Sequence, residues 1–518
     1  MVVGMIHDRI QRAATKMNRW YFQQCYGYDG MSEMNKPSQR ELASMFSEFI
    51  DPNFVIDDAE TLRPYECDGL SVYCEMPLLV LLPETIAQVQ RVMSICHQYH
   101  IPIVARGAGT GLSAGAMPNI DGVVLSLAKF NKILEIDALA RTARLQPGVR
   151  NLAISEAANG YGLYYAPDPS SQIACTIGGN IAENSGGVHC LKYGLTVHNV
   201  LKVEMVTVEG EIVTIGSEGL DFCGFDLLAL LTGSEGLLGV ITEVTVKLLP
   251  VQEKAQVIMA AFDTVQQAGD AVAAVISQGI IPAGLEMMDS HAIRAAEDFV
   301  HAGYPVDAKA LLLCEVDGTL QEVHETIDKV NRIFDQEGAT TTRVSADEKE
   351  RALLWKGRKN AFPAVGRISP DYYCMDGTIP RGQLAFVLSE MDKMSVHFGL
   401  RVANVFHAGD GNLHPLILFD ANADGEFEKA EEFGGKILEL CVAVGGCITG
   451  EHGVGIEKIR QMAIQFNDLE IAQFHGIKAA FDPLGTLNPG KGIPVLKRCQ
   501  EYRSIASASV STAVGVAS

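Results

Sequence analysis

Short apolar runs alternate with polar, glycine-rich segments through the first half of the chain. Residues 78–82 and 103–105 are apolar runs bounded by Pro, Gly or charged positions, which predicts buried strands. Between them, Pro83 to Thr85 opens a helical pattern that reaches about residue 100. A helix over 38–49 is indicated by Ser38 followed three residues later by Glu41, the signature of a capping box. Further strands are predicted at 123–127 and 142–145.

Beyond residue 250 the helical patterns become longer. Helices are predicted at 264–278, 319–337 and 347–361. Short apolar runs at 310–315 and 384–386 predict strands between them. The fold class predicted for the whole chain is α+β, with roughly two to four domains expected from 518 residues.

The segment 404–415 carries the clearest chemical signal. Two apolar runs, 402–408 and 413–419, flank the Asp410–Gly411 pair, which predicts a two-residue type I′ hairpin. A turn centred on that pair places His407 directly opposite His414, with Cβ atoms about 4.5–5.5 Å apart. Two imidazoles at that separation can bind one divalent cation. Two structural histidines on a hairpin are the alternative interpretation.

A second segment, 448–455, offers a third ligand in a glycine-flanked loop that contains Glu451 and His452. Neighbouring residues of an extended loop point to opposite sides, so only one of this pair is expected to reach the metal. The carboxylate of Glu451 suits the metal and leaves His452 to face a substrate as a base. In the alternative arrangement His452 is the ligand and Glu451 lies behind it.

Three separated glycine-rich loops lie in the strand-rich first half. The loop 106–116 follows a predicted strand, and its glycines permit close approach of backbone N–H groups to phosphate. Polar, glycine-dense loops follow at 165–187 and 233–239. Together they suit a long ligand with phosphates and a ribityl or ribose chain, although a flexible turn remains the alternative for any one of them. The Rossmann spacing is not met.

The composition of the chain limits the kinds of molecule that it is expected to bind. A formal charge of -22 argues against nucleic acid and against an anionic membrane surface. The sequence contains no run of about eighteen apolar residues, so a transmembrane helix is not expected. The twelve cysteines are scattered without a ferredoxin-like motif, which suits a cytoplasmic protein without its own iron–sulfur cluster. Gly485 and Gly490-Lys491 have Walker A spacing, but Gly492 replaces the required Ser or Thr.

The order of these motifs identifies a resemblance. His407 and His414, then Glu451 and His452, then the run 488–491 occur as they do in FAD-linked 2-hydroxyacid dehydrogenases, and most closely in the flavin subunits of bacterial glycolate oxidases (glycolate dehydrogenases). The resemblance implies a vanillyl-alcohol-oxidase-type FAD-binding domain, a ferredoxin-like α+β cap domain and a C-terminal helical segment. The implied boundaries are an extension at 1–50, the FAD domain at 51–252, the cap at 253–440, a segment at 441–494 that returns to the flavin, and a tail at 495–518.

The resemblance also implies which residues bind FAD. They are Arg106, Gly107, Ala108, Gly109, Thr110, Gly111, Leu112, Pro167, Asp168, Ser170, Ser171, Thr176, Gly178, Gly179, Asn180, Glu183, Asn184, Gly186, Gly187, Gly233, Glu235, Gly236, Gly239, Val240, Ile241 and Asn488. Thr110 stands where relatives with covalent FAD carry histidine, so FAD is expected to be non-covalent.

The implied reaction is oxidation of glycolate or D-lactate to the 2-oxo acid, with hydride passing to flavin N5. Arg358 is expected to pair with the substrate carboxylate, Asn412 to orient the substrate, and His452 to take the hydroxyl proton. His407, His414 and Glu451 are expected to hold zinc, or alternatively iron or manganese. Relatives that act on 2-hydroxyglutarate carry an extra basic group where this chain has the apolar run 372–375, which favours a short hydroxy acid.

The expected partners are an iron–sulfur subunit, which would take the electrons, and a second flavin-domain-like subunit. Any contact with the membrane, at its inner face, is expected to come through these partners. An oxidase of the same fold that uses oxygen is one alternative, and a catalytically silent scaffold subunit is another. The complete set of two histidines, Glu451 and His452 weighs against the scaffold.

Overall fold

The first described helix follows the capping pattern in the sequence. The computed structural model describes residues 36–219 and 224–494; the first 35 residues of the predicted extension at 1–50 and the predicted tail at 495–518 lie outside these residues. Helix α2 (Gln39–Ser47) begins after Ser38, whose hydroxyl accepts a hydrogen bond from the Glu41 N–H. The Glu41 carboxylate accepts one from the Ser38 N–H in return, so the predicted capping box is confirmed.

A small, largely parallel sheet carries the first glycine-rich loop. Its strand order is β1-β2-β4-β3, and β2, β4 and β3 run parallel to one another. Helix α4 (Ile86–Tyr99) starts at a Thr85 capping box and packs its apolar face into the core beside these strands. The strand bounds are β1 Val55–Ile56, β2 Leu79–Leu81, β3 Ile103–Arg106 and β4 Val123–Ser126.

A second, antiparallel sheet completes the part that the resemblance implies to bind FAD, called the FAD-binding part below. Its order is β5-β6-β10-β8-β9, and its central strand β10 is buried along most of its length. The strands are β5 Ile133–Asp137, β6 Thr142–Leu145, β8 Val200–Val206, β9 Ile212–Gly216 and β10 Val240–Lys247. The helices and short strands that accompany it are α5 Asn151–Ala158, β7 Leu163–Tyr164, α6 Ile177–Glu183, α7 Cys190–Tyr193, α8 Leu227–Leu231 and β11 Leu249–Pro250.

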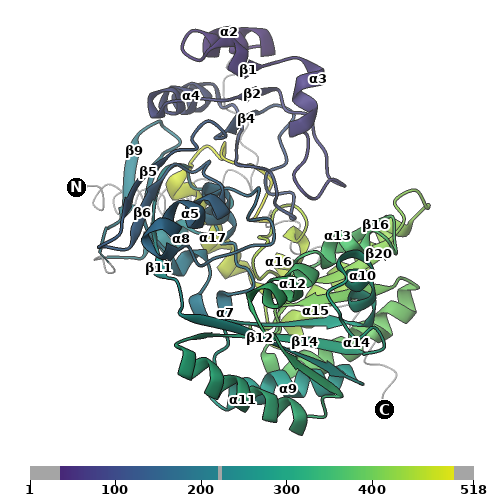
Figure 1. The fold of residues 1–518 in the computed structure, drawn as a ribbon. Coiled ribbons are helices and arrows are strands. Elements are labelled where there is room, and N and C mark those ends of the chain that lie inside the picture. Colours follow the sequence, from purple (N-terminus) through teal and green to yellow (C-terminus); the bar gives the residue numbers. More distant parts are fainter. Residues whose placement is uncertain (1–35, 220–223, 495–518) are drawn as a thin grey trace.

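The cap domain is built on one seven-stranded sheet of order β15-β12-β14-β13-β18-β20-β16 (Figure 1). Alternate residues of β12 pack into two different cores, because successive side chains of a strand point to opposite faces of the sheet. Ile258 and Ala260 pack with helices α9, α11, α14 and α15, whereas Val257 and Met259 pack with α10, α12 and α13. The sheet is therefore covered by helices on both faces.

The cap elements have the following bounds. The strands are β12 Lys254–Phe262, β13 Gly284–Asp289, β14 Ala310–Gly318, β15 Thr341–Val344, β16 Asp371–Cys374, β18 Val402–Phe406 and β20 Pro415–Phe419. A separate two-stranded pair is β17 Gly377–Thr378 and β19 Asn412–Leu413. The helices are α9 Val265–Ser277, α10 Ser290–Val300, α11 Leu320–Gln336, α12 Glu348–Lys359, α13 Ala361–Val365, α14 Leu384–Phe398 and α15 Glu426–Ala443.

One predicted strand is wrong. Residues 384–386 form the first turn of helix α14, in which Leu384, Val387, Leu388 and Met391 are buried. That spacing is helical, and three consecutive apolar residues are too short a window to distinguish the two periods.

The C-terminal segment joins the two parts. Helix α16 (Ile459–Gln465) contributes Met462 to the cap core, whereas Ile477 and Phe481 of α17 (Asp468–Phe481) pack on the core of the FAD-binding part. The chain then reaches β3, where Leu487 forms a bridge with Ile103. Figure 1 shows this yellow segment running between the two parts. Among the described residues, no helix combines the length and apolarity needed to cross a membrane.

A mutation at Asp289 tests how the cap sheet is joined to its helices. The Asp289 carboxylate caps α10 by accepting from the Ala292 N–H, and it also accepts from the N–H and the side-chain amide of Asn404. Asp289→Ala removes the cap and leaves buried donors unpaired, which should cost about 2–4 kcal/mol. Asp347→Ala, which removes the exposed cap of α12, should cost only about 1 kcal/mol. Equal thermal destabilisation of the two variants would contradict this assignment.

Candidate active site

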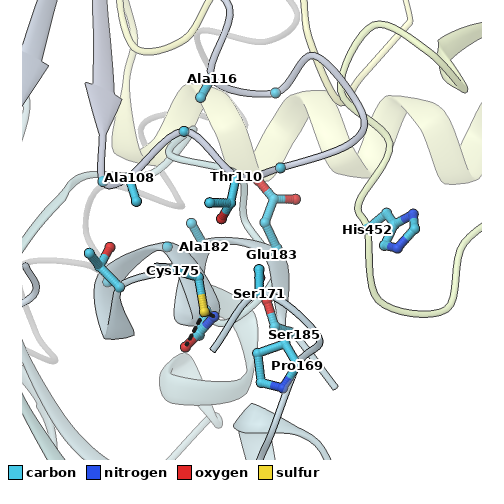
Figure 2. Close-up of a pocket in the computed structure, with 18 of the residues that line it drawn as sticks. Ala108, Thr110, Ala116, Pro169, Ser171, Cys175, Ala182, Glu183, Ser185 and His452 are labelled. Carbon is cyan, nitrogen blue, oxygen red and sulfur yellow. Dashed lines mark hydrogen bonds between the residues drawn. The ribbon is translucent and has the colours of Figure 1, made fainter. Parts of the chain in front are cut away.

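A cavity of about 500 Å³ lies between the glycine-rich loop 106–116 and helix α6. Residues from the cap, among them Lys359, Phe362 and His414, close its far end together with Glu451 and His452. Figure 2 shows the loop that carries Thr110 on one side of the cavity, Ala182 and Glu183 on another, and His452 on a separate loop. The cavity therefore lies between the FAD-binding part and the cap.

The glycine-rich loop is pressed against neighbouring backbone and side chains. A Cβ on Gly107 would lie 2.3 Å from the Thr176 hydroxyl oxygen, and Gly109 has a positive φ of 70° with Arg106 directly beside it. The hydroxyl of Thr176, which lines the cavity, is buried and has no hydrogen-bond partner among the described residues. Such a surface of glycine backbone and an unpaired hydroxyl fits the phosphate-bearing part of a flavin cofactor.

Most of the residues expected to bind FAD line this cavity. They are Arg106, Gly107, Ala108, Gly109, Thr110, Gly111, Leu112, Ser170, Ser171, Thr176, Gly178, Gly179, Asn180, Glu183, Glu235, Gly236, Gly239 and Ile241. The expected residues that are not part of its wall are Pro167, Asp168, Asn184, Gly186, Gly187, Gly233, Val240 and Asn488.

Three of the residues outside the wall contact residues that line it. The Asn488 amide donates to the carbonyls of Gly115 and Glu235, so it supports the glycine-rich loop from behind. Asp168 binds His189 and Lys359. The Gly186 N–H donates to Glu451. These residues hold the wall in place from outside the cavity.

Several wall residues were not predicted from the sequence. Lys359, Asn360, Phe362 and Pro363 reach the cavity from the junction of α12 and α13. The run of basic residues in helix α12 was the available signal in the sequence, but it did not indicate which side chains face the cavity. Apolar wall residues such as Leu127 and Pro147 carry no sequence signal at all.

The hairpin register differs from the predicted one. His407 pairs with Asn412, and Asn404 pairs with Pro415, so four residues connect the strands instead of two. The N–H groups of Asp410 and Gly411 both donate to the His407 carbonyl. In this register His414 is diagonal to His407 on the same face, and the two ring centroids are 5.0 Å apart. The histidines therefore meet, although the predicted direct pairing is wrong.

Three side chains converge at this point. Oε1 of Glu451 lies 3.3 Å from Nε2 of His407 and 3.3 Å from Nε2 of His414. The potential ligand atoms of these residues all lie within 4.8 Å of one another, and Nε2 of His414 is buried without a hydrogen bond among the described residues. Two imidazoles and a carboxylate with a shared focus fit a divalent transition-metal ion.

The orientation of His407 is fixed from behind. Its Nδ1 lies 2.7 Å from Oε1 of Glu286, a buried residue of β13, and Oε2 of Glu286 lies 2.6 Å from Nη2 of Arg358. Burial opposes protonation of His407, but Glu286 and Glu451 raise its pKa well above the ordinary value. The site therefore has the negative potential and the outer carboxylate typical of a histidine metal ligand.

Asp376 lies on the other side and holds the loop. It is fully buried and accepts hydrogen bonds from the N–H groups of Gly450, Glu451 and His452 at 2.8–3.2 Å. Burial favours its neutral form, but His452, Lys458 and His414 hold its pKa well below the ordinary value. This anion fixes the backbone from which Glu451 and His452 diverge.

Asp376, His414 and His452 form a second group whose potential ligand atoms are close enough to hold a metal. Asp376 is already engaged by three backbone N–H groups and by the Thr449 hydroxyl at 2.7 Å. Oε1 of Glu451 lies 3.3 Å from each of the two imidazoles and accepts no backbone N–H within residues 36–219 and 224–494. The group with Glu451 is therefore the better candidate for a metal.

His452 faces the cavity beside these ligands. Its ring stacks parallel on that of His414 at 4.9 Å, and its buried Nδ1 has no hydrogen-bond partner among the described residues. Burial lowers the pKa of His452 to about 4, against the opposing effect of Asp376. The imidazole is therefore neutral at ordinary pH and can accept a proton.

The last two predicted residues lie behind the cavity wall. Arg358 is 1% exposed, and its Nε and Nη2 atoms have no hydrogen bond among the described residues, although Nη2 forms the ion pair with Glu286. Asn412 is also buried, with Oδ1 unpaired. Neither belongs to the wall as it stands. Asn412 pairs with His407 in the hairpin, and Arg358 is linked to His407 through Glu286.

The fold is shared with two enzymes of known structure. The chain matches 4-ethylphenol oxidase from Gulosibacter chungangensis with a TM-score of 0.73 and 20% identity, covering 90% of this chain and 98% of that one. It matches p-cresol methylhydroxylase with a TM-score of 0.74 and 17% identity at the same coverage. At these identities the likeness concerns the fold alone.

Residues 77–216 match the model of an FAD binding domain, and residues 251–492 match that of the FAD linked oxidases, C-terminal domain. The chain belongs to the FAD-linked oxidases and is an FAD-dependent oxidoreductase. It is 64% identical to glycolate oxidase subunit GlcD of Escherichia coli (strain K12), over 86% of this chain and 90% of that protein. It is 38% identical to subunit GlcD of Bacillus subtilis, over 84% and 93%, and 32% identical to a D-lactate dehydrogenase of Archaeoglobus fulgidus, over 80% and 90%.

Replacing Asp376 by Asn tests its role in holding the loop. The neutral amide cannot match the anion as an acceptor for three N–H groups, and it leaves Lys458 without one of its two carboxylate partners. We expect the variant to lose about 3–5 kcal/mol of stability and to bind less of a divalent metal that is supplied to it. Glu457→Gln removes the other partner of Lys458 and should lower stability without loss of metal. Equal metal contents in both variants, by elemental analysis, would contradict the role of Asp376.

Proposed function

We propose that this chain oxidises a short 2-hydroxy acid, glycolate or D-lactate, to the 2-oxo acid, using FAD and one divalent cation. Its similarity to proteins named glycolate oxidase subunit and D-lactate dehydrogenase supports this substrate class. The observation that carries the proposal is the convergence of His407, His414 and Glu451 at the end of the flavin cavity. There a bound cation and a bound flavin would contact the same small substrate.

The unpaired buried atoms around this point match the groups of a 2-hydroxy acid. Nε of Arg358 is a donor suited to a carboxylate, and Nδ1 of His452 and Oδ1 of Asn412 are acceptors suited to a hydroxyl. When bound, FAD would accept the hydride from C2 and the cation would polarise the 2-hydroxyl. His452 would take the hydroxyl proton at Nδ1, Asn412 would orient the hydroxyl, and Arg358 would hold the carboxylate.

We propose zinc as the first choice of cation, on the type of its ligands. Iron and manganese are alternatives, because they also accept two imidazoles and a carboxylate. FAD is proposed to be non-covalent, since Thr110 stands on the cavity wall where a covalent relative would carry histidine.

The electrons are proposed to leave through an iron–sulfur partner subunit, with a second flavin-domain-like subunit in the complex. The similarity to proteins named as subunits of glycolate oxidase supports an assembly of several chains. Within residues 36–219 and 224–494, the groups able to hold a metal contain no cysteine.

Removing either histidine of the pair should remove the metal but not the flavin. His407→Ala and His414→Ala each delete one of three ligands, whereas the FAD cavity is built mainly by the FAD-binding part. Elemental analysis should find little metal in both variants, with the FAD-to-protein ratio unchanged. His324→Ala, an exposed histidine on α11, is the matched control. Full metal content and full activity in either ligand variant would show that this pair is not the metal site.

His452→Ala should separate proton transfer from cofactor binding. Because Nδ1 of His452 faces no protein partner among the described residues, its loss should leave metal and FAD in place. The rate of flavin reduction by glycolate, measured anaerobically by stopped flow, should fall by about 10²–10⁴-fold. Loss of metal from His452→Ala but not from Glu451→Gln would instead reverse the assignment of ligand and base.

A further inference from the structure

Helix α13 (Ala361–Val365) places one aromatic side chain at the substrate end of the cavity. Three of its residues, Ala361, Ala364 and Val365, are fully buried in the core formed with helix α10 and the cap sheet. Phe362 is only partly buried and, with Pro363, forms part of the cavity wall. The buried side of the helix therefore fixes the position of the Phe362 ring.

The ring is held between a proposed metal ligand and the edge of the sheet. Its centroid lies 6.0 Å from that of His414, with the planes at 67°, and 6.4 Å from that of Tyr372 on β16, with the planes at 74°. Edge-to-face contacts of this kind orient aromatic rings. Phe362 thus occupies the space directly beside the metal ligands.

The charged residues on this part of the cavity wall do not favour a second carboxylate on the substrate. Lys359 is the cation that lines the cavity next to Phe362, and its Nζ lies 3.2 Å from Oδ2 of Asp168. Tyr372, on the other side of the ring, is uncharged at ordinary pH. A distal carboxylate placed here would lose water without gaining a free cation, which is costly.

We infer that Phe362 limits the length of the substituent on C2, and so confines the enzyme to acids that carry hydrogen or methyl there. This inference rests on the proposed function and deepens it. In this arrangement, a substrate whose hydroxyl lies at His407, His414 and Glu451 would have its C2 substituent on the side of the Phe362 ring, which contacts His414. Each methylene that a pocket accepts or rejects changes the specificity ratio by about 10–200-fold.

The test is anaerobic flavin reduction by a series of D-2-hydroxy acids with two to five carbons. In Phe362→Ala, the ratio of kcat/KM for the five-carbon acid to that for glycolate should rise by at least about 10-fold over the unsubstituted protein. Metal and FAD contents should be unchanged. Phe386→Ala, which removes a half-exposed phenylalanine of α14, should leave the ratio unchanged.

Two failures can be told apart. If the unsubstituted protein is reduced by glycolate but Phe362→Ala keeps the same ratio, the role of Phe362 is overturned and the proposed function stands. If no 2-hydroxy acid reduces the flavin of the unsubstituted protein, both are overturned. Phe362→Leu should give an intermediate ratio, since it shortens the side chain without emptying the space.

Discussion

The buried carboxylate of Asp376 is the constraint on which the candidate site depends. An anion in this position is tolerated because three backbone N–H groups, the Thr449 hydroxyl and Lys458 surround it. Those N–H groups belong to residues 450–452, so the same bonds that stabilise the anion fix the loop. With the backbone held, Glu451 points to the histidine pair and His452 points to the cavity.

A set of polar contacts joins the two parts of the fold around this loop. Glu451 accepts from the Gly186 N–H, and Glu235 accepts from the N–H groups of Val454 and Gly455. Further from this loop, His189 lies between Asp168 and Glu315. Burial disfavours the protonated form of His189, but the two carboxylates outweigh this effect and raise its pKa to about 10. The cavity wall is therefore built jointly by both parts of the fold, and it includes His414 and Glu451 of the candidate metal group.

The sequence predicted the features whose signals are local. The Ser38 capping box and the glycine-rich wall depend on neighbouring residues, and the structure contains them. The hairpin register was wrong because the Asp410–Gly411 pair does not fix the loop length by itself, although the period of two still brought both histidines to one face. Asp376, Glu286 and Phe362 gave no signal, since a single acidic or aromatic residue acquires its role only from distant segments that pack against it.

The central claim is that a metal ion is bound by His407, His414 and Glu451 beside the flavin. The most direct measurement is anomalous diffraction from crystals of the metal-loaded protein, recorded on both sides of the absorption edge of the metal. We expect one strong peak at about 2.0–2.2 Å from the two Nε2 atoms and from a Glu451 oxygen. A peak bound instead by Asp376, His414 and His452, or no peak in protein that turns over, would contradict it.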